Sequence, residues 1–278
     1  MMSLQVVRRK IMSGNWLDLS QKVIVVTGGS MGIGENIVRN LLDNGAKVVI
    51  ADLVENEEQT LNDSVLFVPC DITKKTDAEK CIEMAVEKFG RIDGLVNNAG
   101  ANRPNLLVDY YHQDSRREMS EEELDIMYQV NQKGLFLISQ AAAREMVRQK
   151  SGVIVNISSE AGMEGSKGQS GYSATKGAVN SFTLSWAKEL GQFNIRVIGV
   201  APGINEPTPM GNQKHMEKLA YTRGIQSGEI KGDYTKIIPL GRIGRLQEVA
   251  DLVSYLQSDH SSYITGTIIN VTGGKSRG

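Results

Sequence analysis

The chain has 278 residues, of which 40% are hydrophobic, so it can bury a large core within one domain. Its 31 basic and 32 acidic residues almost cancel, which argues against nucleic acid or an anionic membrane surface as a partner. Without a transmembrane run or a secretory signal in the sequence, we expect a cytoplasmic protein that acts on a small molecule.

We predict an N-terminal extension over residues 1–20 and a single domain over residues 21–278. Within the domain, two segments interrupt the regular pattern: residues 101–119 are polar and charged, and residues 204–236 are only weakly helical. Both follow the carboxyl ends of predicted strands, where ligands bind in open α/β sheets. We expect them to form the rim and lid of a substrate site.

Short β-branched runs alternate with longer segments of helical period. Most of the runs lack polar alternation, which is typical of a parallel sheet that helices cover on both faces. This order predicts an α/β protein with a doubly wound, seven-stranded sheet. The expected strands lie within residues 22–29, 46–52, 65–70, 92–100, 152–159, 194–203 and 267–274, and the expected helices near 33–44, 76–89, 120–149, 171–190 and 246–257.

The first strand is followed by a glycine-rich turn. Gly28, Gly32 and Gly34 would let the backbone turn sharply and approach a pyrophosphate, held at the positive end of the helix that starts near Ile33. The spacing departs from the common dinucleotide fingerprint GxGxxG. The alternative is a tight turn that binds no ligand.

The second strand ends at Asp52, eighteen residues beyond Gly34. A carboxylate there can accept hydrogen bonds from the adenosine hydroxyls and would repel a 2′-phosphate. The loop offers Met31 in place of a basic residue, so the pattern favours NAD over NADP. The alternative for Asp52 alone is a capping acid at the end of a strand.

The two cysteines, Cys70 and Cys81, lie eleven positions apart without a third cysteine or a neighbouring histidine. This spacing fits neither a zinc cluster nor a redox CxxC pair. We expect reduced, buried thiols, and the sequence predicts no metal site.

Six motifs occur in a characteristic order: TGGSMGIG at 27–34, NNAG at 97–100, Asn131 in VNQKG, NISS at 156–159, YSATK at 172–176 and APG at 201–203. With them the chain resembles the short-chain dehydrogenase/reductase family from Lys22 to Gly274. The resemblance implies a single-domain Rossmann fold and a catalytic tetrad. Matched motif by motif, the tetrad is Asn131, Ser159, Tyr172 and Lys176, and the serine is chosen because it lies thirteen residues before the tyrosine.

The same resemblance implies a set of NAD-binding residues. Asp71 matches the acid beside the adenine ring, and NNAG matches the stretch beside the adenosine ribose. The full set is Gly28, Met31, Gly32, Ile33, Gly34, Asp52, Asp71, Ile72, Asn98, Ala99, Gly100, Tyr172, Lys176, Pro202, Gly203 and Ile204.

In such a tetrad Tyr172 removes the proton of an alcohol while hydride leaves its carbon. A free tyrosine has a pKa of about 10, so we expect Lys176, one helical turn later, to lower the pKa by its charge. Ser159 would steady the developing alkoxide, and Asn131 would hold a water against Lys176. An isolated YxxxK pair is more often a solvated surface pair.

Beyond these motifs, stretches such as SSEAGMEGS and GGKSRG resemble family members that act on a phosphorylated polyol. The basic candidates for binding the phosphate are Arg103, Lys167, Lys214 and Arg223, and Glu160 could accept bonds from polyol hydroxyls. The alternative for each basic residue is a solvated surface charge.

Two other functions remain open at this point. One is a dehydrogenase or reductase of another polyol, a sugar or a 3-oxoacyl substrate, and the other is a catalytically silent NAD-binding protein. The family resemblance also implies a homotetramer that assembles through the helices at 120–149 and 171–190, although the alanines of QAAAREM could equally pack inside one subunit.

Overall fold

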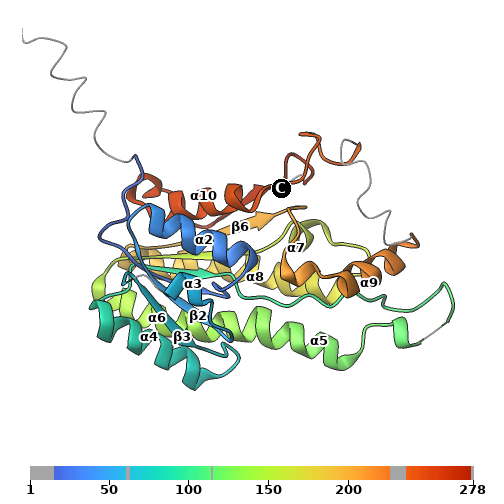
Figure 1. Cartoon of the computed structure of the whole chain (residues 1–278), viewed down its shortest axis with the longest axis horizontal. Coiled ribbons are helices and arrows are strands. Elements are labelled where there is room, and N and C mark those ends of the chain that lie inside the picture. The colour runs from blue at the N-terminus through green and yellow to red at the C-terminus, as the bar shows by residue number, and fades with distance from the viewer. Residues whose placement is uncertain (1–15, 61–62, 114, 226–235, 277–278) are drawn as a thin grey trace, which may run out of the picture.

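Seven parallel strands form one sheet in the computed structural model, which describes residues 16–60, 63–113, 115–225 and 236–276 (Figure 1). The strands are β1 (Val23–Thr27), β2 (Lys47–Asp52), β3 (Val65–Pro69), β4 (Gly94–Asn97), β5 (Gly152–Ile157), β6 (Ile195–Pro202) and β7 (Thr267–Val271). Their spatial order is β3-β2-β1-β4-β5-β6-β7. The order reverses between β1 and β4, which creates the crevice where doubly wound folds bind ligands. The predicted fold is confirmed.

The central strands are buried on both faces. Every residue of β1 and β5 is buried, and β1 pairs with β2 so that Val23 lies opposite Lys47 and Thr27 opposite Ala51. Burying a Val, Leu or Ile side chain contributes about 1.5–3 kcal/mol, which explains strands that lack polar alternation. The parallel register brings the carboxyl ends of β1, β2, β4 and β5 to one edge of the sheet.

Helices cover the two faces in separate groups. α2 (Gly32–Asp43) and α10 (Leu246–Gln257) lie on one face, and α4 (Lys75–Phe89) and α6 (Leu135–Gln149) lie on the other, together with the last turns of α8 (Ser170–Leu190) (Figure 1). Ile37 and Val253 anchor the first group to the sheet, and Ile82 and Ile138 anchor the second. Among the described helices, none has the length and apolar character to cross a membrane.

The helix predicted over residues 120–149 contains a π-helical turn. α5 (Glu121–Tyr128) is followed by η2 (Gln129–Gly134) and then by α6. A Cβ at Gly134 would lie 2.7 Å from Ile72 Cγ1, so the glycine lets this turn pass close to the loop after β3. Such turns are frequent at functional sites, and this one carries the buried Asn131.

Among the described residues, three α-helices are not in the set predicted from the sequence: α3 (Glu57–Thr60), α7 (Ala161–Glu164) and α9 (Gln213–Arg223). α9 lies within the predicted rim segment 204–236, of which residues 226–235 are outside the described part of the chain. The side chain of Asn212 caps α9, since its Oδ1 accepts a hydrogen bond from His215 N at 3.0 Å.

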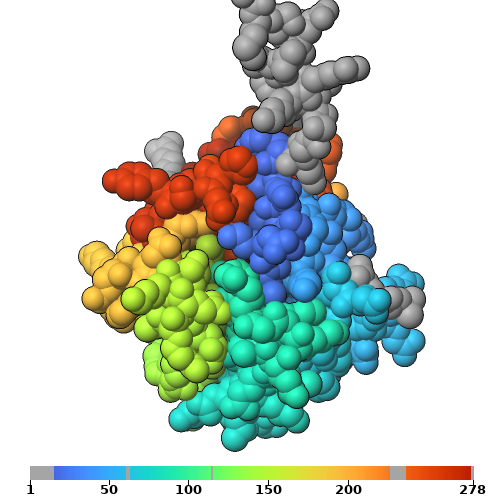
Figure 2. All heavy atoms as spheres, turned by 90° about the vertical axis from the view of Figure 1, so that its left-hand side faces the viewer, coloured from blue at the N-terminus to red at the C-terminus, as the bar shows by residue number. Residues whose placement is uncertain are grey.

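The described N-terminal residues pack at the amino end of the sheet, away from the glycine loop. The Trp16 ring stacks on His260 with centroids 5.1 Å apart, and Lys22 Nζ lies 2.9 Å from Asp259 Oδ1. Figure 2 shows the N-terminal part of the chain (blue) beside its C-terminal part (red). Residues 1–15 of the predicted extension lie outside the described residues, whereas Leu19 is fully buried in the core.

Candidate active site

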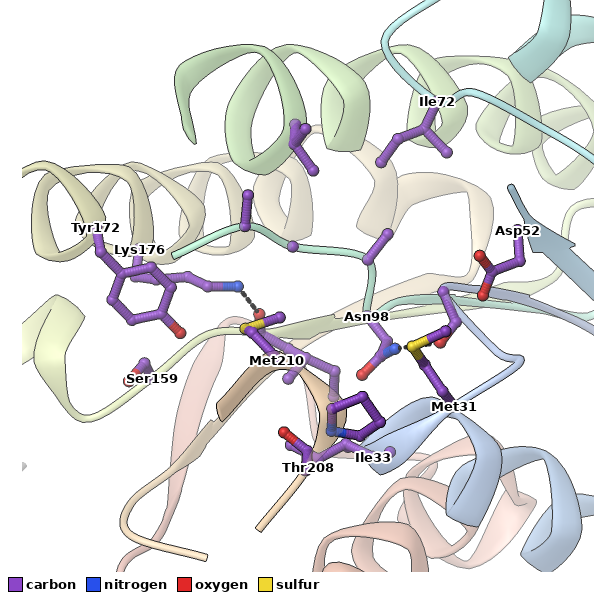
Figure 3. Close-up of a pocket in the computed structure, with 18 of the residues that line it drawn as sticks. Met31, Ile33, Asp52, Ile72, Asn98, Ser159, Tyr172, Lys176, Thr208 and Met210 are labelled. Atoms are coloured by element: carbon purple, nitrogen blue, oxygen red, sulfur yellow. Dashed lines mark hydrogen bonds between the residues drawn. The ribbon is translucent and has the colours of Figure 1, made fainter. Parts of the chain in front are cut away.

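A cleft of about 620 Å³ lies at the carboxyl ends of the strands, within the size range of small-molecule sites. Figure 3 shows Asp52 and Met31 at one end and Tyr172, Ser159 and Lys176 at the other. The loops after β1 to β6 all contribute to its lining. The cleft therefore joins the predicted cofactor loop to the predicted catalytic residues. Of the predicted cofactor residues, all except Gly34 and Ile204 line it.

The glycine loop leaves no room for side chains at two positions. Gly28 has a φ of +63°, and a Cβ there would lie 2.9 Å from Ala99 Cα. A Cβ at Gly34 would lie 1.9 Å from Gly28 O, so Gly34 shapes the loop from behind although it does not line the cleft. The backbone of the loop can therefore approach a pyrophosphate at the positive end of α2.

The carboxylate of Asp52 is fixed by backbone donors. Its Oδ2 accepts a hydrogen bond from Ser30 N at 3.0 Å, and its Oδ1 accepts one from Leu53 N at 2.7 Å. Both oxygens keep lone pairs that can face the cleft. The loop beside Asp52 exposes Met31 and contains no lysine or arginine. This end of the cleft suits ribose hydroxyls and disfavours a phosphate there.

Asn98 has a structural task in addition to lining the cleft. Its Nδ2 donates to Gly28 O at 2.8 Å and to Thr27 O at 3.1 Å, while Thr27 Oγ1 accepts from the backbone N of Asn98 and of Ala99, each at 3.0 Å. These bonds join the ends of β1 and β4. The sequence motif identifies Asn98 but does not show that its amide holds the glycine loop.

Asp71 lies beside Ile72 in the loop after β3, and both line the cleft. Asp71 Oδ1 accepts hydrogen bonds from Thr73 Oγ1 at 2.7 Å and from Thr73 N at 3.1 Å. The hydrogen bond from the Thr73 hydroxyl lowers the pKa of Asp71, so this acid is ionised at neutral pH. Cys70 also lines the cleft, and both cysteines are buried and free, as predicted.

Ser159, Tyr172 and Lys176 line the other end of the cleft together. Ser159 comes from the turn after β5, and the other two come from the first turns of α8, one helical turn apart. Ser159 lies on the hydroxyl side of the Tyr172 ring (Figure 3). Lys176 is 4% exposed, and its Nζ donates to Ile157 O at 2.7 Å, drawn as the dashed line that starts at Lys176 in Figure 3.

Burial dominates the ionisation of this pair. It raises the pKa of the Tyr172 hydroxyl, which the hydrogen bond with Ser159 lowers only in part. Burial also lowers the pKa of Lys176 to about 8. The lowered tyrosine pKa that we expect from the sequence is therefore absent in the protein alone, where Lys176 Nζ lies 5.8 Å from the tyrosine ring centroid.

Asn131 does not line the cleft. Its Nδ2 donates to Ala101 O at 2.8 Å and to Thr175 Oγ1 at 2.9 Å, and its Oδ1 accepts from Ala101 N at 2.7 Å. Both amide hydrogens are thus used within the protein. The side chain fastens the loop after β4 to α8, next to Lys176, and the role of Asn131 in holding a water stays a prediction.

Of the five predicted substrate residues, only Arg103 lines the cleft. Lys167 Nζ instead donates to Tyr111 Oη at 3.1 Å and lies over the ring of Tyr110, 5.7 Å from its centroid. Lys214 and Arg223 are exposed on α9, outside the cleft lining. The cleft lining therefore lends no support to these three residues as phosphate ligands, and their role stays a prediction.

The fifth candidate, Glu160, is already paired. Its Oε1 lies 2.7 Å from Lys275 Nζ, and its Oε2 accepts a hydrogen bond from Ser276 Oγ at 3.0 Å. Its carboxylate therefore binds the C-terminal segment, and its contact with substrate hydroxyls stays a prediction.

The two rim segments pack on each other beside the cleft. Tyr221 Oη on α9 donates to Asp109 Oδ2 at 2.7 Å, and Lys218 Nζ lies 2.7 Å from Glu123 Oε1 on α5. The second segment also supplies lining residues that the sequence reasoning missed, because they follow neither a motif nor a periodic pattern: Asn205, Thr208, Pro209, Met210 and Asn212.

The family model for short chain dehydrogenases matches residues 22–218 of this chain. The chain belongs to that family, so the predicted class of oxidoreductase is confirmed. It is 51% identical over 264 residues to the sorbitol-6-phosphate 2-dehydrogenase of Klebsiella pneumoniae, covering 95% of this chain and 99% of the relative.

Other relatives span the same length. A 3-oxoacyl-[acyl-carrier-protein] reductase of Thermotoga maritima is 38% identical, covering 93% of this chain and 99% of the relative. The crystal structure of an NAD⁺-bound xylitol dehydrogenase superposes with a TM-score of 0.83 at 27% identity, covering 94% of this chain and all of that one.

Proposed function

We propose that this protein interconverts D-sorbitol 6-phosphate and D-fructose 6-phosphate with NAD as its cofactor, by hydride transfer at C2. The observation that carries the proposal is the single cleft that holds Asp52 and the glycine loop at one end and Ser159, Tyr172 and Lys176 at the other. The substrate class is suggested by the relative of 51% identity, which is a sorbitol-6-phosphate 2-dehydrogenase.

The residues present fit an NAD molecule. Gly28 and Gly34 form a cradle that any Cβ would fill, and Asp52 presents a fixed carboxylate where the adenosine ribose would lie. Asp71 and Ile72 would hold the adenine, while Pro202 and Gly203 would flank the nicotinamide end. When bound, NAD⁺ accepts the hydride that leaves the C2 carbon of the alcohol.

The chain's own residues handle the proton. Tyr172 removes the hydroxyl proton as hydride leaves C2, and Ser159 donates a hydrogen bond to the oxygen, which becomes the ketone oxygen. Lys176 places a positive charge near the phenolate that forms. The reaction thus converts the alcohol and NAD⁺ into ketone, NADH and one released proton. Asn131 positions Lys176 through its bonds to Ala101 and Thr175.

Arg103 would bind the phosphate. Apart from Lys176, it is the only basic side chain among the described residues that line the cleft. It is exposed, and its Nη1 donates a hydrogen bond to the neighbouring Asn102 O at 3.2 Å. A guanidinium can bind a phosphate through two parallel hydrogen bonds.

One panel of substrates tests the proposal. With NAD⁺, we expect kcat/KM for sorbitol 6-phosphate to exceed that for free sorbitol by at least about 100-fold, the size of a charge-assisted pair. The second candidate, a 3-oxoacyl reductase, is favoured by the Thermotoga maritima relative. Efficient NADH oxidation by a 3-oxoacyl thioester, with equal rates for the two sorbitols, would replace the first proposal by the second.

The protein would work in the cytoplasm as a homotetramer. An apolar surface on α6 and α8 supports assembly: Phe136 is exposed, and Phe182 stacks on Trp186 with centroids 4.9 Å apart. Ala143 lines a hollow together with Phe136 and Trp186, and its small side chain allows another helix to approach closely. Sedimentation of the full chain should give four times the mass of 30.4 kDa. A monomer at micromolar concentration would contradict it.

A further inference from the structure

The carboxylate next to the catalytic serine is held by the C-terminal end of the chain. Glu160 directly follows Ser159, and its two oxygens bind Lys275 Nζ at 2.7 Å and Ser276 Oγ at 3.0 Å. The side chains of Glu160 and Lys275 are 14% and 26% exposed. Removing one partner from an ion pair this sheltered from water costs more free energy than removing one from a surface pair.

The C-terminal segment is shaped to deliver Lys275 to this position. Gly273 and Gly274 both have positive φ, +63° and +86°, which bends the chain after β7. A Cβ at Gly273 would lie 2.7 Å from Ile238 Cγ2, so the bend requires glycine. Lys275 N then donates to Thr272 O at 3.2 Å and closes the turn.

Glu160 connects this segment to two parts of the cleft wall. Its backbone N donates to Pro202 O at 3.1 Å, and a Cβ at Gly203 would lie 2.9 Å from its Oε2. On its other side, Ala161 N donates to Ser159 Oγ at 3.2 Å. The Ser159 hydroxyl, which would bind the substrate oxygen, therefore belongs to a turn whose Glu160 carboxylate is held by the C-terminal segment.

We propose that Lys275, with Ser276, is a positioning residue: by pairing with Glu160 it keeps the Ser159 turn and the Pro202–Gly203 loop in the geometry needed for hydride transfer. Without Lys275, Glu160 would be a sheltered carboxylate without its cation. It would seek other donors in the turn and would place an uncompensated negative charge near the alkoxide that forms. The inference rests on the proposed dehydrogenase activity.

The test compares Lys275 with a second lysine that is equally sheltered but pairs with an exposed carboxylate. Lys275→Met should lower kcat by about 10-fold while the KM for NAD⁺ and the Kd for NADH stay within about 2-fold, because one misplaced hydrogen bond costs about this much. The control is Lys22→Met, which removes the pair with Asp259 at the amino end of the sheet, where the lysine side chain is 25% exposed. We expect the control to retain wild-type kcat.

Two further variants separate positioning from general stability. Lys275→Arg keeps the charge and should restore most of kcat. A Glu160→Gln background removes the charge that needs pairing, so adding Lys275→Met to it should cost less than it costs in the wild type. Equal losses in both backgrounds, a kcat of Lys275→Met within 2-fold of wild type, or a fall in Tm that fully accounts for the loss would overturn the inference.

This outcome can be told apart from failure of the proposed function. The wild-type protein is first assayed with the substrate panel, and the variant ratios are then measured with whichever alcohol or ketone gives the highest turnover. Activity on a different substrate with the predicted ratios would refute the substrate proposal and support the positioning role. If the protein oxidises sorbitol 6-phosphate but Lys275→Met has the same kcat as wild type, the substrate proposal is supported and the positioning role is refuted.

Discussion

Lys176 Nζ donates a hydrogen bond to Ile157 O at 2.7 Å and lies 5.8 Å from the centroid of the Tyr172 ring. Its charge can therefore reach the tyrosine only through space in the protein alone. Since burial raises the pKa of Tyr172 in this state, the hydroxyl is protonated at neutral pH. Activation of the base must depend on the bound cofactor, whose positive ring would add to the lysine charge.

The buried charge of Lys176 should lower the free energy of unfolding of the cofactor-free protein. Its pKa falls from 10.5 in the unfolded chain to about 8 in the fold, which corresponds to about 3 kcal/mol against folding below pH 8. The lost hydrogen bond to Ile157 offsets about 1 kcal/mol. We therefore expect Lys176→Met to be more stable than wild type by about 2 kcal/mol at pH 7, measured by urea unfolding.

The sign of the pH dependence follows from the direction of this shift. Between about pH 8 and 10.5 the unfolded wild type binds more protons than the folded one, so wild-type stability rises with pH in that window. The advantage of Lys176→Met should shrink across this window and turn into a deficit of about 1 kcal/mol above it, where only the lost hydrogen bond to Ile157 remains. The exposed Lys214→Met serves as control and should show no such trend. An advantage that is constant with pH would contradict the assignment.

Tyr172→Phe should abolish turnover while it preserves cofactor binding. The variant keeps the ring in the cleft but loses the group that takes the proton, so kcat should fall by about 10²–10⁴-fold. The Kd for NADH, measured by fluorescence titration, should stay within about 3-fold of wild type. A catalytically silent NAD-binding protein would instead retain its full biological function in this variant, which a growth assay on sorbitol can reveal.

Asp52 should decide the choice between NAD and NADP. Asp52→Asn removes the negative charge and keeps an acceptor for only one of the Ser30 and Leu53 amides, because the side-chain amide has a single oxygen. We expect the ratio of kcat/KM for NAD⁺ to that for NADP⁺ to fall by at least about 10-fold, because a 2′-phosphate is no longer repelled. Asp52→Ala should lower it further by removing the acceptor for the ribose. An unchanged ratio in both variants would count against this account.

Arg103 should contribute to recognition of the phosphorylated substrate alone. Arg103→Met should raise the KM for sorbitol 6-phosphate by about 10–100-fold, the value of a hydrogen bond to a charged group, and leave free sorbitol unaffected. Lys214→Met, outside the cleft, is the matched control and should behave as wild type. Equal effects of Arg103→Met on both substrates would show that the arginine shapes the rim without binding the phosphate.

The sequence predicts the layers of the fold well because they depend on local patterns. Residues 23–26 are all apolar, and the glycine loop and YSATK have spacings that few other structures need. Contacts between distant segments are another matter. No local signal indicates that Lys167 lies over Tyr110 or that Glu160 pairs with Lys275. Nor does one indicate that the Asn131 side chain donates a hydrogen bond to Ala101 O.

The same limit applies to the rim. α9 has a low density of apolar residues and is held by Asn212 at its start and by Tyr221 bonding Asp109, so its stability comes from the tertiary contacts. Met210 lies in the cleft only because β6 and α9 bring it there (Figure 3). Sequence periodicity could not identify it.

The most direct test of the central claim follows the hydrogen at C2. Sorbitol 6-phosphate carrying deuterium at C2 is incubated with the full-length protein and NAD⁺. The account predicts fructose 6-phosphate, deuterium on the nicotinamide ring of the NADH formed, and a primary isotope effect whenever chemistry limits the rate. NADH that carries no deuterium, or no NADH at all while another alcohol is oxidised, would contradict it.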